Sequence, residues 1–164
     1  MKKAKNFKLL GTSNKLVELN KIKSKYTVLY FYPKDDTPGC TLETKDFNLF
    51  YNKFIKLNCE IYGISKDTIE SHLKFKKKYK VKFELLSDEN KIAIKEFKVW
   101  GKKKFMGKEF MGLIRSTFLL KKNNIIKEWR NVRVKGHAEE IYNFIKNNKL
   151  CLLYTSDAAD EVDR

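Results

Sequence analysis

The sequence predicts an α/β fold in which a central mixed β-sheet is flanked by helices, and three patterns support this prediction. Residues 26–32 form an unbroken run of β-formers, which is typical of a strand covered on both faces. Apolar residues at helical spacing then predict a helix from about residue 40 to residue 56. Further along, two β-rich runs within 116–129 flank a polar turn, which indicates a hairpin.

The other elements alternate between strand and helix. In chain order, we expect a strand at 26–32, a helix at 40–56, a strand at 59–64, a capped helix carrying Ile69, Leu73 and Tyr79, a strand at 83–86, a helix at 89–97, an irregular stretch at 100–112, strands at 116–120 and 125–129, and a final helix with Ala138, Ile141, Phe144 and Ile145 on one face. Parallel βαβ units followed by a hairpin and a helix describe a thioredoxin-like fold.

The length of the chain suits one domain. With 164 residues, of which 42% are hydrophobic, it can bury one substantial core. We expect this domain to span residues 1–150 and residues 151–164 to be a non-native or disordered tail, because that segment has no lysine and turns acidic. No window resembles a membrane span or the apolar centre of a signal peptide, so we expect a cytoplasmic protein that does not contact membranes.

The cysteines argue against a metal or disulfide framework. Cys40, Cys59 and Cys151 are odd in number and have no metal-ligand spacing. We therefore expect no metal site and at least one free thiol. We also expect no cofactor.

The formal net charge of +16 raises the possibility of a basic nucleic-acid-binding module. The charge comes almost entirely from lysine, and no nucleic-acid-binding motif accompanies it. We interpret the lysines as solvated surface and expect no specific nucleic-acid partner.

Cys40 occupies a position with a chemical use. It follows a strand and a turn, in the first turn of the predicted helix, where free backbone N–H groups and the helix dipole stabilise a thiolate. Pro38 keeps Thr37 extended, and Gly39 lets the chain pass close to the thiol. The alternative is that Cys40 is an ordinary small apolar residue.

The residues around Cys40 favour the first interpretation. The segment FYPKDDTPGCT resembles the P-x-x-x-T-x-x-C signature of peroxiredoxins, and its wording is similar to the bacterioferritin comigratory protein, or peroxiredoxin Q, subfamily. The resemblance covers roughly residues 7–149. Further segments that look like this subfamily follow in its order: Gly63–Ser65, Leu85–Glu89, Val99–Gly101, Phe105–Gly107 and Arg115–Leu119.

The resemblance implies a thiol-dependent peroxidase that reduces hydrogen peroxide and alkyl hydroperoxides through a sulfenic acid on Cys40, in antioxidant defence. It also implies that the Thr37 hydroxyl contacts peroxide and thiolate and that Arg115 completes the site. A guanidinium would stabilise both the sulfur and the leaving oxygen. We further assign Pro33, Gly39 and Glu43 to substrate binding. Glu43 either orients Arg115 by a salt bridge or is simply favoured at a helix N-terminus.

The chain departs from the subfamily at the second cysteine. Many members carry a resolving cysteine five residues after the nucleophile, where this chain has Lys45. We therefore expect a one-cysteine cycle, in which an external thiol such as thioredoxin, glutaredoxin or glutathione reduces Cys40. We also expect a monomer. Cys59 should lie at the opposite end of the sheet, and Cys151 belongs to the suspect tail.

Neither a C-x-x-C pair nor a histidine at ligand spacing is present in the sequence. A thioredoxin-fold thiol-disulfide oxidoreductase would use a C-x-x-C pair, whereas Cys40 is followed by Thr41, Leu42 and Glu43. His72 and His137 have no carboxylate or cysteine at ligand spacing, and we expect neither to be catalytic.

Overall fold

The computed structural model describes residues 2–155, 157, 158, 160 and 161, with side chains described as far as residue 148. An eight-stranded mixed sheet forms its centre, in the order β1-β10-β9-β4-β5-β6-β2-β3. The predicted α/β, thioredoxin-like class is confirmed. The strands of this sheet are β1 (Lys2–Lys3), β2 (Lys8–Gly11), β3 (Leu16–Glu18), β4 (Tyr26–Phe31), β5 (Cys59–Ser65), β6 (Glu84–Ser87), β9 (Ser116–Lys121) and β10 (Asn124–Arg130).

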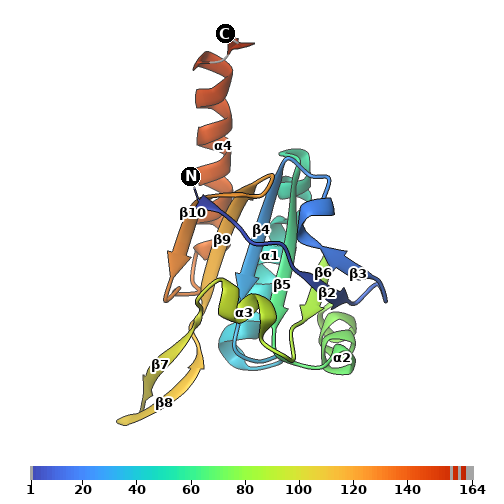
Figure 1. Cartoon of the computed structure of the whole chain (residues 1–164), viewed down its shortest axis with the longest axis vertical. Helices are drawn as coiled ribbons and strands as arrows, with labels where there is room; N and C mark the ends of the chain where they lie inside the picture. The colour runs from blue at the N-terminus through green and yellow to red at the C-terminus, as the bar shows by residue number, and fades with distance from the viewer. Residues whose placement is uncertain (1, 156, 159, 162–164) are drawn as a thin grey trace.

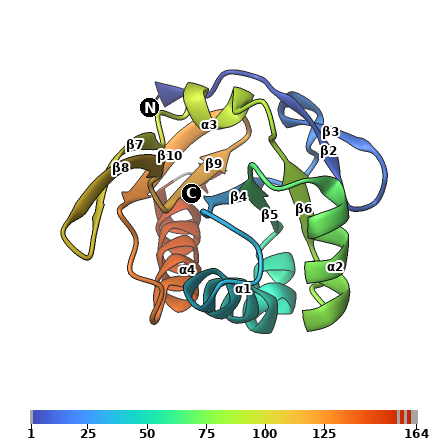
Figure 2. The ribbon, with the colours of Figure 1, turned by 90° about the horizontal axis from the view of Figure 1, so that it is seen from below.

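Helices cover both faces of the sheet. Figure 2 shows α1 (Pro38–Lys56), α2 (Ile69–Tyr79) and α4 (His137–Thr155) on one side and α3 (Ile92–Glu96) on the other. A short 3-10 turn, Leu19–Lys21, follows β3. The helices pack against the sheet through two separate apolar clusters, one on each face.

Strand β4 lies at the centre and forms part of both clusters. It runs parallel to β5 and antiparallel to β9, and all six of its residues are buried, as the run of β-formers predicts. Because side chains alternate along a strand, Val28 and Tyr30 join the cluster beneath α1, α2 and α4, whereas Leu29 and Phe31 join the cluster beneath α3. The strand therefore fixes the position of the loop that leads from its end into α1.

The stretch 100–112, expected to be irregular, is a β-hairpin. Strands β7 (Trp100–Phe105) and β8 (Lys108–Leu113) pair with each other and project from the body of the protein (Figure 1). Met106 and Gly107 turn the chain with positive φ angles of 52° and 80°. Most hairpin residues are exposed on both faces, so the sequence has no apolar alternation there to indicate strands.

Other boundaries also differ from expectation. The N-terminal strands β1, β2 and β3 were not anticipated, because they are only two to four residues long. Helix α3 has five residues instead of the nine expected. Helix α4 continues through residue 150, the expected domain boundary, to Thr155. Two short strands, β11 (Asp157–Ala158) and β12 (Asp160–Glu161), follow; residues 156, 159 and 162–164 of the expected tail lie outside the described residues, and the division at residue 150 stays a prediction.

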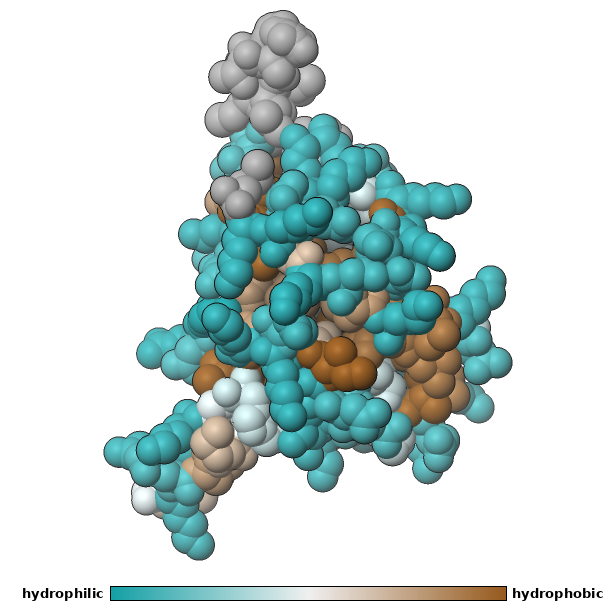
Figure 3. All heavy atoms as spheres, viewed as in Figure 1, coloured by the Kyte–Doolittle hydropathy of each residue, from teal (hydrophilic) through white to brown (hydrophobic). Residues whose placement is uncertain are grey.

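Hydrophilic side chains cover most of the face shown in Figure 3, which accords with the interpretation of the lysines as solvated surface. Among the described residues, no helix is long and apolar enough to cross a membrane.

Candidate active site

The loop after β4 delivers the chain into the start of helix α1. Thr37 is the N-cap, with φ −93° and ψ 155°, and Pro38 stands in the first turn, where its missing N–H costs no helical hydrogen bond. The Thr41 N–H closes the first helical turn onto the Thr37 carbonyl oxygen at 2.8 Å. The Thr37 hydroxyl donates to the Lys34 carbonyl oxygen at 2.9 Å instead of capping the helix. The first-turn N–H groups are thus left to serve a ligand or a thiolate.

Cys40 lies in this first turn and is fully buried. Arg115 approaches it from the segment between β8 and β9, with Nη2 3.3 Å from Cys40 Sγ. The sheet register explains how residues 75 positions apart meet. Ser116 pairs with Phe31, so the residue before β9 lies next to the end of β4 and therefore next to the start of α1.

Gly39 allows this approach. A Cβ atom at position 39 would lie 3.2 Å from Arg115 Nη2, which is tighter than ordinary van der Waals contact. A side chain at this position would require the guanidinium to shift by a few tenths of an ångström. Gly39 therefore contributes to the site by leaving room for the Arg115 guanidinium beside the backbone.

Glu43 holds the other side of the guanidinium. Arg115 Nη1 donates to Glu43 Oε1 at 2.6 Å, and the Glu43 side chain is only 1% exposed. Burial raises the pKa of Glu43 to about 7, although the positive charge of Arg115 acts in the opposite direction. Glu43 Oε2 is buried and has no hydrogen-bond partner among the described residues. Of the two interpretations of Glu43, the structure supports the salt bridge to Arg115.

The structure thus brings together four of the expected site residues: Cys40, Arg115, Glu43 and Gly39. Thr37 lies one helical turn before Cys40, and half-buried Pro33 begins the loop between β4 and Thr37.

Lys103 is a neighbour of the site that the sequence did not reveal. It stands on β7, and partial burial together with the charge of Arg115 lowers its pKa, while Cys40 acts in the opposite direction. Because Lys103 interacts electrostatically with both Arg115 and Cys40, it is a second cation near the sulfur. The residue belongs to the run Lys102–Lys104, which we interpreted as surface charge, and only the unanticipated hairpin brings it to the site.

Cys59 lies at the other end of the sheet, as expected. It pairs with Tyr26 at the start of β4, whereas Cys40 follows the end of that strand. The length of β4 alone, about 17 Å, exceeds the separation of about 7 Å between Cα atoms that a disulfide tolerates. Burial also raises the pKa of the Cys59 thiol strongly, so it remains an unreactive thiol.

A buried thiol held by a guanidinium at a helix N-terminus suits attack on a peroxide, and comparison with known proteins agrees. A model of the AhpC/TSA family matches residues 1–129. This chain belongs to the AhpC/TSA family. Peroxiredoxin Bcp of Bacillus subtilis is 47% identical over 146 residues, which is 88% of this chain and 93% of that protein. A putative peroxiredoxin bcp of Helicobacter pylori is 42% identical, covering 84% of this chain and 91% of that protein.

Solved peroxiredoxin structures have the same fold. The bacterioferritin comigratory protein of Xanthomonas campestris, studied for alkyl peroxide reduction, superimposes with a TM-score of 0.81 at 36% identity, covering 87% of this chain and 91% of that chain. PrxQ of Xylella fastidiosa gives a TM-score of 0.83 at 34% identity, covering 91% of this chain and 98% of that chain. As a peroxiredoxin of the Bcp and peroxiredoxin Q group, the chain is a peroxidase that depends on a thiol.

Replacing Glu43 by Gln should change how stability depends on pH. The pKa of Glu43 in the folded protein, about 7, lies above its ordinary value of 4.5, so folding disfavours the ionised form. Wild-type stability should therefore fall, relative to Glu43→Gln, as pH rises from about 4.5 to about 7, by on the order of 2 to 3 kcal/mol. Urea unfolding of both proteins at pH 5 and pH 8 measures this difference.

Glu89→Gln, which removes an exposed carboxyl group, is the matched control. A stability difference between wild type and Glu43→Gln that is equal at both pH values would contradict the burial of an ionisable Glu43.

Proposed function

We propose that Cys40 is the peroxidatic nucleophile of this peroxiredoxin. The observation that carries the proposal is the 3.3 Å contact between Arg115 Nη2 and Cys40 Sγ at the N-terminus of α1. The Cys40 thiolate attacks one oxygen of the peroxide, and an S–O bond forms as the O–O bond breaks. The electron pair leaves with the second oxygen, which takes up a proton and departs as water or an alcohol, and Cys40 becomes a sulfenic acid.

The neighbouring residues take complementary roles in this step. Arg115 offers a permanent positive charge to the sulfur and to the leaving oxygen. The Thr37 hydroxyl donates to Lys34, so its oxygen still has lone pairs that accept a hydrogen bond from the peroxide. Glu43 fixes the orientation of the guanidinium, and Gly39 and Pro33 shape the approach to it.

Access to the site favours small substrates. Cys40 is fully buried, and the side chain of Arg115 is 16% exposed, so the route to the sulfur is narrow. We propose hydrogen peroxide and alkyl hydroperoxides as substrates, in antioxidant defence. The activity studied in the X. campestris relative supports the second class.

The cycle that we propose uses one cysteine. Lys45 occupies the position of the usual resolving thiol, and Cys59 is distant and unreactive. The side chain of Cys151 lies outside the described residues. An external thiol, from thioredoxin, glutaredoxin or glutathione, then reduces the sulfenic acid. Because Cys40 is buried, this thiol reaches the sulfur only when the first turn of α1 opens. A monomeric state and a cytoplasmic location stay predictions.

Replacement of Cys40 by Ser should abolish peroxide turnover while leaving the fold intact, because the change removes the thiolate and little volume. The measurement is hydrogen peroxide consumption with each of the three thiol donors in turn, together with circular dichroism. Cys59→Ser is the matched control and should retain activity, since Cys59 is remote from the site. Substantial turnover by Cys40→Ser would overturn the proposal.

Mass spectrometry after one equivalent of peroxide tests the one-cysteine cycle. We expect a sulfenic acid on Cys40, and a mixed disulfide when a small thiol is added, because no partner cysteine lies within reach among the residues with described side chains. An intramolecular disulfide from Cys40 to Cys59 or Cys151, formed as fast as turnover, would refute this cycle and leave the role of Cys40 as nucleophile untouched.

A further inference from the structure

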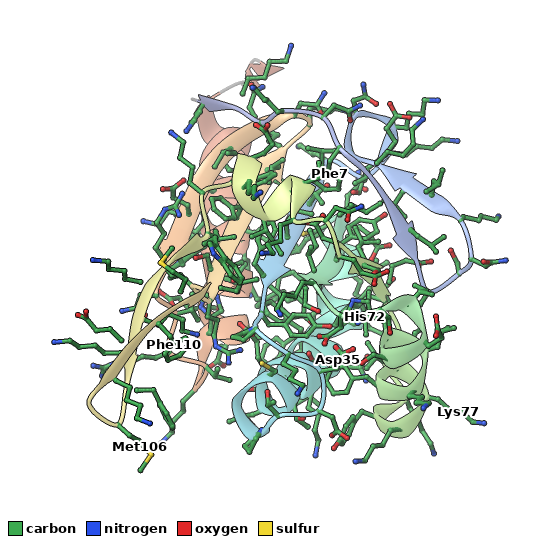
Figure 4. All side chains as sticks on the ribbon, turned by 60° about the horizontal axis from the view of Figure 1, so that its bottom comes forward. Phe7, Asp35, His72, Lys77, Met106 and Phe110 are labelled. Carbon is green, nitrogen blue, oxygen red and sulfur yellow. The ribbon has the colours of Figure 1, made fainter. Side chains whose placement is uncertain are left out.

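A buried contact between a histidine and an aspartate connects helix α2 to the loop that carries the candidate site. Asp35 stands in that loop, between β4 and Thr37, and His72 stands on α2. His72 Nδ1 lies 2.7 Å from Asp35 Oδ2, and the two side chains are 0% and 4% exposed (Figure 4). In the sequence His72 has no carboxylate at ligand spacing. The fold supplies one from a distant segment, because the loop after β4 packs against α2.

Both ring nitrogens of His72 face hydrogen-bond acceptors. Its Nε2 atom lies 2.9 Å from the Leu86 carbonyl oxygen, which can only accept a hydrogen bond. Asp35 also serves as an acceptor, since the Tyr32 hydroxyl reaches its Oδ1 at 2.6 Å and the Ser71 hydroxyl reaches its Oδ2 at 2.8 Å. With an acceptor opposite each ring nitrogen, the geometry suits a His72 ring that donates hydrogen bonds from both nitrogens and pairs with the Asp35 carboxylate.

The backbone of Asp35 is held as firmly as its side chain. Its N–H donates to Asp67 Oδ2 at 2.8 Å, and the same oxygen accepts from the Ser65 hydroxyl at 2.6 Å. Ligand atoms of Asp35, Asp67 and His72 lie within 4.8 Å of one another. These hydrogen bonds engage both His72 nitrogens and Asp67 Oδ2, and they join the three residues in one network.

The next residue of the loop, Asp36, is also held by helix α2. Asp36 has a positive φ of 57°, a left-handed conformation that costs free energy in a residue other than glycine. Its carboxylate accepts hydrogen bonds from Lys78 at 2.8 Å and from Tyr79 at 2.7 Å, both near the end of α2. Helix α2 therefore holds two consecutive loop residues, and Thr37 and the first turn of α1 follow directly.

We propose that His72 is a positioning residue for the peroxide reaction: the buried His72–Asp35 ion pair fixes the loop that places Thr37 and the first turn of α1 around Cys40. His72 does not contact the reacting atoms and acts through Asp35. This inference rests on the proposed role of Cys40. The buried His72–Asp35 pair should stabilise the loop more than the exposed Lys78–Asp36 pair does. Removing one partner of a buried ion pair costs far more free energy than removing one partner of an exposed pair.

The test compares His72→Gln with wild type in the reaction of reduced enzyme with one equivalent of hydrogen peroxide, followed by stopped flow. Loss of the imidazolium should lower the second-order rate constant by about 10- to 100-fold through misplacement of the loop. Lys78→Ala removes the exposed contact between the same helix and the same loop, and it is the matched control. It should change the rate by less than about 3-fold.

Buried Cys59 separates positioning from general loss of structure. Its rate of alkylation by iodoacetamide reports opening of the sheet far from the loop. A slow peroxide reaction with Cys59 still protected supports the proposal. Equal peroxide rates in His72→Gln and wild type would overturn it. So would a slow peroxide reaction accompanied by an equally large increase in the rate of Cys59 alkylation. Failure of the wild type itself to react would instead refute the role of Cys40.

A second measurement needs no variant. Nitrogen chemical shifts of the His72 ring in the ¹⁵N-labelled wild type at pH 7.5 should show both nitrogens protonated. The pattern of a neutral ring, with one unprotonated nitrogen, would overturn the proposal even where His72→Gln fails to fold. Asp35→Asn should slow the peroxide reaction as much as His72→Gln, and the double variant should add little, since the two residues act as one unit.

Discussion

The guanidinium of Arg115 lies between two acidic groups that are excluded from water, with Nη2 on the Cys40 sulfur and Nη1 on the Glu43 carboxylate. A buried cation costs free energy unless it is paired, and these two contacts pair Arg115 through both of its terminal nitrogens and fix the plane of the group. Much of the surrounding structure serves this arrangement. The pairing of Ser116 with Phe31 brings Arg115 to the end of β4, and Gly39 leaves room for it.

The same arrangement creates a conflict between reactivity and access. A buried sulfur close to a cation suits attack on a small peroxide, but in the cycle that we propose an external thiol must later reach the same sulfur. In that cycle the loop before α1 is ordered for the peroxide reaction and open for the reduction. Such an opening would either break the contacts from α2 to Asp35 and Asp36 or move α2 together with the loop.

The sequence predicted what depends on local pattern. Three elements carry a clear local pattern: an unbroken run of β-formers in β4, apolar residues at helical spacing after Cys40, and two β-rich runs around a polar turn in β9 and β10. The resemblance named Arg115 and Cys40. The sequence did not reveal the features that depend on packing between distant segments. The exposed hairpin β7–β8 has no apolar alternation, so the position of Lys103 near the site was hidden. The burial of His72 was hidden too, because its carboxylate partner comes from a loop 37 residues earlier.

The measurement that tests the role of Arg115 most directly is the rate at which reduced enzyme consumes one equivalent of hydrogen peroxide, compared between wild type, Arg115→Lys and Arg115→Ala. Removing the guanidinium should slow the reaction by about 100- to 1000-fold. Lysine should recover only part of the loss, because a single ammonium cannot hold Cys40 and Glu43 in the same planar geometry. Rates within about 3-fold of wild type for Arg115→Ala would contradict a site organised by this residue.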